Sequence, residues 1–142
     1  SGPACYLAAR EPVRGVILHS PIASGIRALT GGGCCSPVHV YACLDPFNNL
    51  REVTKIDAPV FVIHGTADEE IPVKHGQLLH DNSKVKYDPF FVDGAGHNNL
   101  LEIADETYFT KIHAFLDTLL AAPRKISHMK SNSKSSMRPR RA

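Results

Sequence analysis

The chain has 142 residues, enough for one small domain, and contains no apolar run approaching the roughly 18 residues that a membrane-spanning helix needs. Its net charge of +2 is unevenly distributed along the chain, because seven of the 16 basic residues and none of the 14 acidic ones lie in residues 123–142. That segment is rich in Ser, Lys and Arg and has no periodic apolar face, so we expect a disordered basic tail.

The first half of the chain predicts one helix end, one strand and a long excursion. Residues 1–10 are typical of the end of a helix, and an apolar strand over 13–19 follows, closed by Pro21 because proline cannot donate to a sheet. Residues 24–50 show weak periodicity and include the glycine triplet 31–33, which predicts a loop. A short helical turn is expected over 50–56. The apolar side of the first helix is expected to consist of Ala4, Cys5, Leu7 and Ala8.

The second half predicts two strands, each followed by a helix. Residues 60–64 form a compact apolar run typical of a buried strand, and a helix is expected over 73–82. A further strand is expected over 85–92, where Pro89 indicates an edge or bulged position. The clearest helix spans 105–120. Its apolar residues recur three and four positions apart and are Tyr108, Ile112, Phe115, Leu116 and Leu119.

Strands that alternate with helices predict an α/β fold with a parallel sheet covered by helices. The expected domain covers residues 1–122, with the basic tail at 123–142. Three strands make a small sheet, and the apolar strand around Val16–Leu18 would form an exposed edge, which is an aggregation hazard. We therefore expect further strands to lie beside it, and the start at Ser1 without a leader indicates a fragment or a processed chain.

The cysteine content favours reduced thiols in a cytosolic setting. There are four cysteines and none falls in a Cys-x-x-Cys pair. Cys35, His39 and Cys43 have metal-like spacing but provide three ligands, whereas structural zinc sites usually close with four. We expect no metal and no cofactor.

Two Gly-containing turns carry the candidate catalytic groups. Asp68 follows the strand at 60–64 after Gly65-Thr66-Ala67, and His97 follows the strand at 85–92 after Gly94-Ala95-Gly96. Parallel-sheet enzymes mount catalytic side chains at the carboxyl ends of their strands. Histidine can accept and return a proton near neutral pH, and a buried carboxylate can fix its tautomer. The order acid then histidine is the second half of the Ser…Asp…His order of the α/β-hydrolases.

The nucleophile of such a triad is missing from the sequence, since no Gly-x-Ser-x-Gly occurs. Ser20 follows a strand, but Ser20-Pro21 is not expected to form the turn that exposes a nucleophile, and Ser1 lacks the required spacing. His64 and His75 are interpreted as structural. Taken alone, an aspartate after a strand is more often a helix cap, and it is the pair in this order that favours catalysis.

Several ordered motifs closely resemble the alpha/beta hydrolase domain-containing protein 17 family of serine hydrolases, which remove palmitate from protein cysteines at membranes. The resemblance covers roughly residues 1–120. The matching stretches are Leu18-His19-Ser20-Pro21-Ile22, Ser24-Gly25-x-Arg27, Asp45-x-Phe47-x-Asn49, Pro59 to Thr66 with Asp68-Glu69, His75-Gly76, and Gly94-Ala95-Gly96-His97-Asn98.

The resemblance implies Asp68 as the triad acid and His97 as the triad base, with the nucleophilic serine a few residues before Ser1. Residues 31–43 depart from the family's pattern. The implied substrate is an S-acylated protein, and the implied location is the cytoplasm or the cytoplasmic face of membranes. The basic tail is expected to attract an anionic membrane surface, and nucleic acid is not expected. Two alternatives stay open: an inactive remnant or binding module, and another esterase or serine peptidase of the same fold.

Overall fold

The structure is a computed structural model and describes residues 1–25 and 48–122. The expected glycine loop at 31–33, the spaced Cys35, His39 and Cys43, and the basic tail at 123–142 lie outside the described residues. The chain orders its elements as α1 (Gly2–Ala8), β1 (Val16–His19), α4 (Asn49–Val53), β2 (Val60–Gly65), α5 (Lys74–Asn82), β3 (Phe90–Val92) and α6 (Leu100–Ala121).

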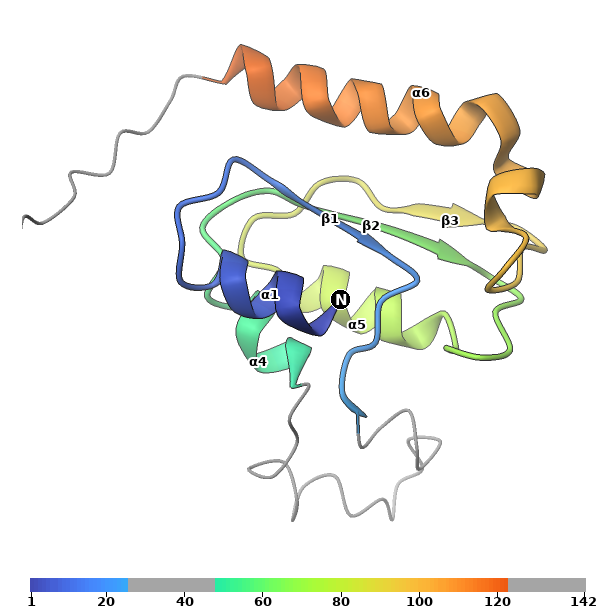
Figure 1. Ribbon diagram of the computed structural model, residues 1–142, viewed down its shortest axis with the longest axis horizontal. Helices are drawn as coiled ribbons and strands as arrows, with labels where there is room; N and C mark the ends of the chain where they lie inside the picture. Colours follow the sequence, from blue (N-terminus) through green and yellow to red (C-terminus); the bar gives the residue numbers. More distant parts are fainter. Residues whose placement is uncertain (26–47, 123–142) are drawn as a thin grey trace, which may run out of the picture.

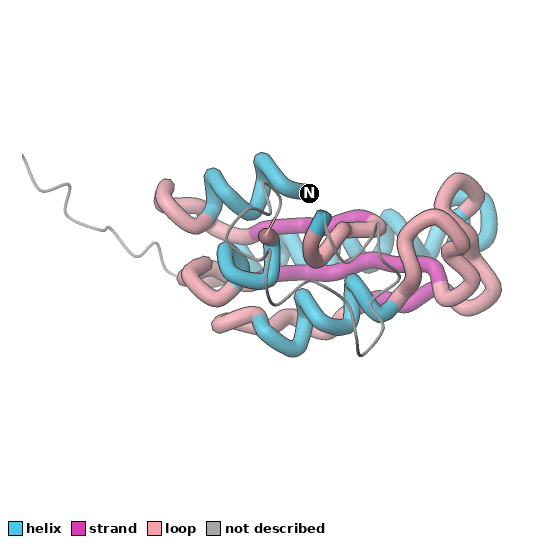
Figure 2. Tube along the Cα trace, turned by 90° about the horizontal axis from the view of Figure 1, so that it is seen from below, coloured by secondary structure: helices cyan, strands magenta, loops and turns pink. Residues whose placement is uncertain are grey.

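The described part of the chain forms a three-layered α/β/α arrangement around a parallel sheet. The strand order is β1-β2-β3, with Val16 opposite Val60 and Ile63 opposite Phe90. Helix α6 covers one face, and α1, α4 and α5 cover the other (Figure 1). Seen from the side of these three helices, the strands run side by side behind them (Figure 2). The predicted α/β fold with a parallel sheet and flanking helices is confirmed.

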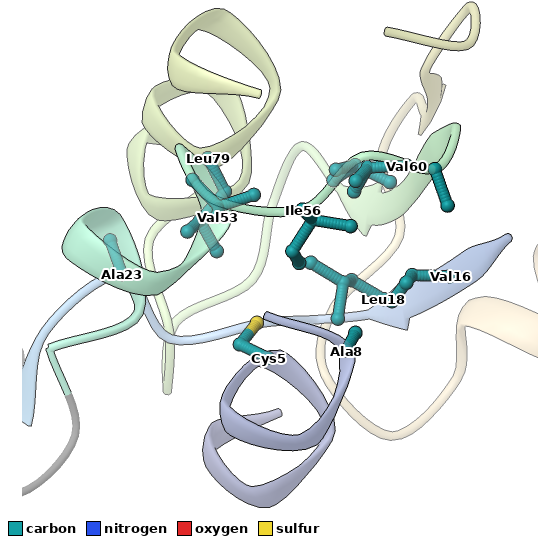
Figure 3. Packing of buried hydrophobic residues seen from close by; sticks show 11 residues of the cluster. Cys5, Ala8, Val16, Leu18, Ala23, Val53, Ile56, Val60 and Leu79 are labelled. Atoms are coloured by element: carbon teal, nitrogen blue, oxygen red, sulfur yellow. The ribbon is translucent and has the colours of Figure 1, made fainter. Parts of the chain in front are cut away.

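The central strand β2 is buried along its whole length, which explains its continuous apolar run. Because successive side chains of a strand point to opposite faces, β2 contributes to two cores. Val60 and Val62 join the core on the α1, α4 and α5 side (Figure 3). Phe61 and Ile63 join the core under α6, where Phe61 packs against Phe115 with ring centroids 5.3 Å apart.

Two predicted elements differ most from the bounds expected for them. The strand expected over 85–92 is reduced to β3, with one isolated bridge between Lys86 and Val60 before it. Pro89 lies between the bridge and β3 and has no N–H to donate, so the ladder is interrupted there. The helix expected from Asp105 begins five residues earlier at Leu100 and bends at Asp105, whose φ is 46°. Leu100 and Ala104, four positions apart, anchor the added turn in the core under α6.

Three residues predicted to face a core lie at the surface, and one of them is Ala4 of α1, which is exposed. Leu7 of α1 is 56% exposed and Leu116 of α6 is 42% exposed. Both helices are covered by the sheet on one side only, so the periodicity located the correct helices but overestimated the width of their buried stripes. Cys5, Ala8, Tyr108 and Phe115 are buried.

Candidate active site

The loops that follow β2 and β3 are joined backbone to backbone. The amide of Thr66 donates to the carbonyl of Val92, and the amide of Ala67 donates to the carbonyl of Ala95, both at 2.9 Å. Gly65 makes this approach possible, because a Cβ at that position would lie 2.1 Å from the carbonyl oxygen of Ala95. The carboxyl ends of these neighbouring strands therefore form one rigid edge.

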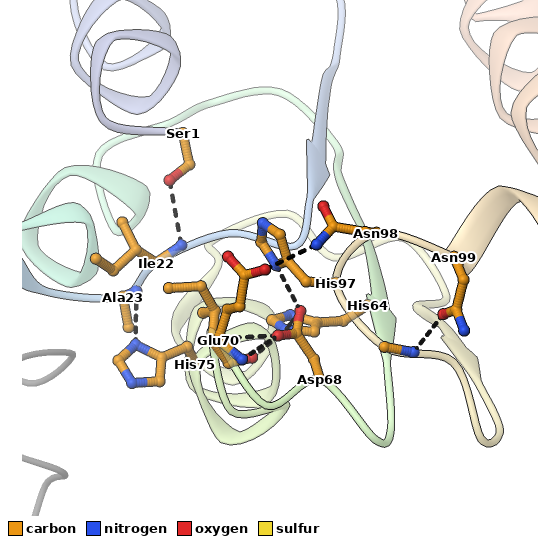
Figure 4. A network of polar contacts seen from close by, with 12 residues as sticks. Ser1, Ile22, Ala23, His64, Asp68, Glu70, His75, His97, Asn98 and Asn99 are labelled. Atoms are coloured by element: carbon orange, nitrogen blue, oxygen red, sulfur yellow. Dashed lines mark hydrogen bonds and ion pairs between the residues drawn. The ribbon is translucent and has the colours of Figure 1, made fainter.

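Asp68 and His97 meet on that edge. The His97 Nδ1 lies 2.8 Å from Asp68 Oδ2, within hydrogen-bond distance (Figure 4). The Asp68 side chain is fully buried, whereas the His97 side chain is 30% exposed. A carboxylate only accepts hydrogen bonds, so Nδ1 of His97 carries the proton and donates it, which leaves Nε2 as the nitrogen that can accept a proton.

Asp68 is held as a carboxylate by its own turn. Its Oδ1 accepts hydrogen bonds from the amides of Glu70 at 3.0 Å and Ile71 at 2.7 Å. Burial raises the pKa of Asp68, but the hydrogen bonds from Ile71 and His97 and the neighbouring imidazoles outweigh it, so the pKa is lower than usual. Asp68 is therefore ionised at neutral pH and can stabilise a positive charge on His97.

The loop carrying His97 is fastened by two asparagines that the sequence argument did not single out. Asn99 Oδ1 accepts a hydrogen bond from the amide of Gly96 at 2.7 Å. Asn98 Nδ2 donates to Glu70 Oε1 at 2.8 Å and so ties the His97 loop to the Asp68 turn a second time. Glu70 therefore helps to hold the edge together. Short polar side chains that flank the candidate catalytic turn are the only sequence signal that could have indicated these contacts.

A second histidine and a tyrosine lie near the pair. His19, the last residue of β1, places its Nδ1 3.3 Å from the hydroxyl of Tyr108 on α6. Burial lowers the pKa of His19, and the nearby imidazoles of His97 and His64 lower it further. Burial also raises the pKa of the Tyr108 phenol. Both groups are therefore neutral at pH 7, and they place polar hydrogen-bonding atoms at the end of the strand that neighbours β2.

His75 lies near the start of α5, on the face of the sheet opposite α6, and contacts the loop after β1. Its Nδ1 accepts a hydrogen bond from the amide of Ala23 at 3.1 Å. The preceding residue, Ile22, is held by Ser1 Oγ at 3.2 Å from its amide and by Asn49 Nδ2 at 2.7 Å from its carbonyl oxygen. The loop after β1 is thus fixed from three separate segments, as Figure 4 shows for Ser1 and His75.

Ser20 adopts a left-handed backbone conformation, with φ 41°, that the sequence argument did not anticipate. Its Oγ is nevertheless buried and has no hydrogen-bond partner. A nucleophile must reach the substrate, so the structure agrees with the expectation that Ser20 does not expose one.

Within residues 1–25 and 48–122, no group of three or more His, Cys, Asp or Glu side chains is arranged to hold a metal ion. None of the helices in the described ranges combines the length and apolarity needed to cross a bilayer.

Comparison with solved structures identifies the fold of the chain. The chain matches an esterase from Pyrococcus furiosus with a TM-score of 0.59 and 20% identity, covering 81% of this chain and 48% of the esterase. It matches an acylaminoacyl peptidase from Pyrococcus horikoshii with a TM-score of 0.60 and 11% identity, covering 90% of this chain and 23% of the peptidase. At such identities the likeness shows the fold alone, which is that of the alpha/beta hydrolases.

Sequence comparison identifies relatives of the chain at higher identity. The chain is 34% identical over 122 residues to alpha/beta hydrolase domain-containing protein aho-3 of Caenorhabditis elegans, covering 86% of this chain and 35% of the relative. It is 40% identical over 98 residues to human alpha/beta hydrolase domain-containing protein 17B, covering 69% of this chain and 32% of the relative. No protein-family model matches. The chain is therefore a relative of the alpha/beta hydrolase domain-containing protein 17 group and spans about a third of the length of these proteins.

Proposed function

We propose that this chain supplies the acid and the base of a serine hydrolase that cleaves thioesters, and that the reaction is the removal of fatty acyl groups from protein cysteines. The observation that carries the proposal is the 2.8 Å contact between His97 Nδ1 and the buried Asp68 carboxylate. The relatives' names support the hydrolase class, and the resemblance in the motifs around Ser20, Asp68 and His97 supports the thioester substrate.

In the proposed reaction, a serine from outside these 142 residues attacks the acyl carbon while its proton passes to Nε2 of His97. Asp68 orients the ring and stabilises the imidazolium that forms. The carbon–sulfur bond then breaks, and the cysteine thiol leaves with the proton from His97. Water attacks the acyl-serine, again giving its proton to His97, and the fatty acid leaves as the serine takes that proton back.

The proposal predicts that the 142-residue chain has no hydrolase activity by itself, because histidine and aspartate cannot form an acyl-enzyme. A serine-directed fluorophosphonate probe should leave the purified chain unlabelled. A longer version that carries a Gly-x-Ser-x-Gly upstream should be labelled and should cleave a palmitoyl-cysteine peptide. His97→Ala should abolish both signals in that version, whereas His113→Ala, at an exposed position of α6, should leave them unchanged.

Three results would count against the proposal. Labelling of the 142-residue chain that is lost on His97→Ala would show that the nucleophile lies within it. Turnover of simple esters with no turnover of the thioester would favour another esterase of the same fold. A cooperative thermal melt together with an inactive longer version would favour a binding module.

We also propose that the basic segment 123–142 brings the protein to an anionic membrane at the cytoplasmic face. The support is its charge, with seven Lys and Arg residues and no acid, since each basic residue near such a surface contributes about 1 kcal/mol. Cosedimentation with vesicles containing phosphatidylserine should decrease at high salt and on truncation after residue 122. Equal binding of the truncated chain would refute this role.

A further inference from the structure

His64 is a buried imidazole with no place in the mechanism described so far. It is the fifth residue of β2, and its side chain points to the face covered by α5, where it is fully buried. Its Nε2 lies 2.8 Å from the carbonyl oxygen of Ile71 and 3.4 Å from Asp68 Oδ2 (Figure 4). Two acceptors thus surround a single ring nitrogen.

That environment fixes the protonation of the ring. Both neighbours of Nε2 can only accept, so Nε2 carries a hydrogen. The other nitrogen, Nδ1, is buried and has no hydrogen-bond partner. A hydrogen on Nδ1 would be a buried donor without an acceptor, so His64 is neutral and has its proton on Nε2.

The space for this ring is provided by a glycine inside a helix. A Cβ on Gly76 of α5 would lie 2.6 Å from Nδ1 of His64. Glycine in a helix interior is unfavourable relative to alanine. The close approach of the imidazole explains why glycine occupies position 76.

His64 acts on Asp68 in two ways, through the backbone of Ile71 and through the Asp68 carboxylate itself. Its Nε2–H is directed at the carbonyl of Ile71, the residue whose amide binds Asp68 Oδ1, and it also lies close to Oδ2, the oxygen that binds His97. We propose that His64 is a positioning residue that fixes the turn and the carboxylate of Asp68 and thereby sets the orientation of the His97 ring. Its catalytic meaning rests on the proposed function, but the arrangement can be tested without activity.

The first test is proton NMR of the 142-residue chain, in which the hydrogen-bonded ring protons on His97 Nδ1 and His64 Nε2 are assigned. His64→Phe keeps a ring but removes the donor, whereas His64→Gln can place a donor near the former Nε2. We expect the His97 Nδ1 proton signal to shift or disappear in the Phe variant and to remain close to wild type in the Gln variant. His113→Gln serves as the matched control on an exposed helix face.

Gly76→Ala tests the same arrangement without changing the His64 residue, because the added Cβ would displace the His64 ring. We expect it to perturb the His97 ring proton, whereas Gln77→Ala, at the exposed neighbouring position of α5, should not. A His97 signal identical to wild type in both His64→Phe and Gly76→Ala would overturn the proposal.

The second test uses the longer, nucleophile-bearing protein and remains decisive if a variant of the short chain fails to fold. There, His64→Phe should lower kcat on the order of tenfold to hundredfold with little change in KM, and His64→Gln should restore most of it. Equal kcat values for the two variants and wild type would refute the positioning role. If the longer protein shows no activity but the NMR signals behave as expected, the proposed function fails and the arrangement around Asp68 stands.

Discussion

Gly65→Ala tests the idea that close contact between two loops holds the candidate active site together. An added Cβ would lie 2.1 Å from the carbonyl oxygen of Ala95, about 1.3 Å short of the 3.4 Å at which ordinary contact begins. The obstacle is backbone on both sides, so the loop carrying His97 has to move. Overpacking of this kind costs about 1–3 kcal/mol, and loss of the hydrogen bond from Ala67 to Ala95 adds about 1 kcal/mol.

We therefore expect Gly65→Ala to lower the free energy of unfolding by about 2–4 kcal/mol. With a urea m-value of about 2 kcal/mol per M, the unfolding midpoint would fall by roughly 1–2 M without a change in m. The control is Gly96→Ala on the opposite loop, whose Cβ would lie no closer than 3.4 Å to any neighbour. A midpoint for Gly65→Ala equal to that of Gly96→Ala would refute the reasoning.

Three further predictions concern pH, the core and a thiol. Burial raises the pKa of Asp68, but its hydrogen bonds lower the pKa by more, so the folded value lies below the ordinary value of 3.8. The stability that Asp68 contributes is therefore complete above pH 3.8 and is lost as the pH falls through the folded pKa. Asp68→Asn should flatten the acid side of a curve of stability against pH, and an unchanged slope would contradict this. Phe115→Ala should cost about 3–5 kcal/mol in urea unfolding because the ring is buried against Phe61 and Tyr87, while Phe109→Ala, 57% exposed, should cost far less. Burial raises the pKa of the Cys5 thiol to about 11. Mass spectrometry should therefore find Cys5 alkylated by iodoacetamide in urea but not in the native protein. Equal alkylation rates in both conditions would show that α1 does not bury Cys5 in the native protein.

The fold was predictable because its signals are local. Residues 60–64 of β2 form a compact apolar run before Gly65, and the turns that follow β2 and β3 end in Asp68 and His97. Sequence order then sufficed to predict that they belong together. The catalytic role assigned to them remains a prediction, whereas their contact is a feature of the structure.

What the sequence could not indicate depends on contacts between distant segments. His64 was interpreted as structural because a buried strand position looks the same whether or not a carboxylate lies beside it. The link between Asn98 and Glu70 spans 28 positions and leaves no periodic pattern. Leu116 satisfied the helical period, yet its exposure depends on how much of α6 the sheet covers.

The loop after β1 shows how tightly irregular backbone can be integrated into this fold. The amides of Ile22 and Ala23 donate to Ser1 and His75, which belong to segments far apart along the chain. Loop amides usually exchange with solvent deuterium quickly, but the Ala23 amide, whose hydrogen bond to His75 is buried, is released only when helix α5 moves away from the loop. The exchange rate of the Ala23 amide therefore reports on the opening of the helical layer that contains α5, and it measures cooperative unfolding on that face of the sheet.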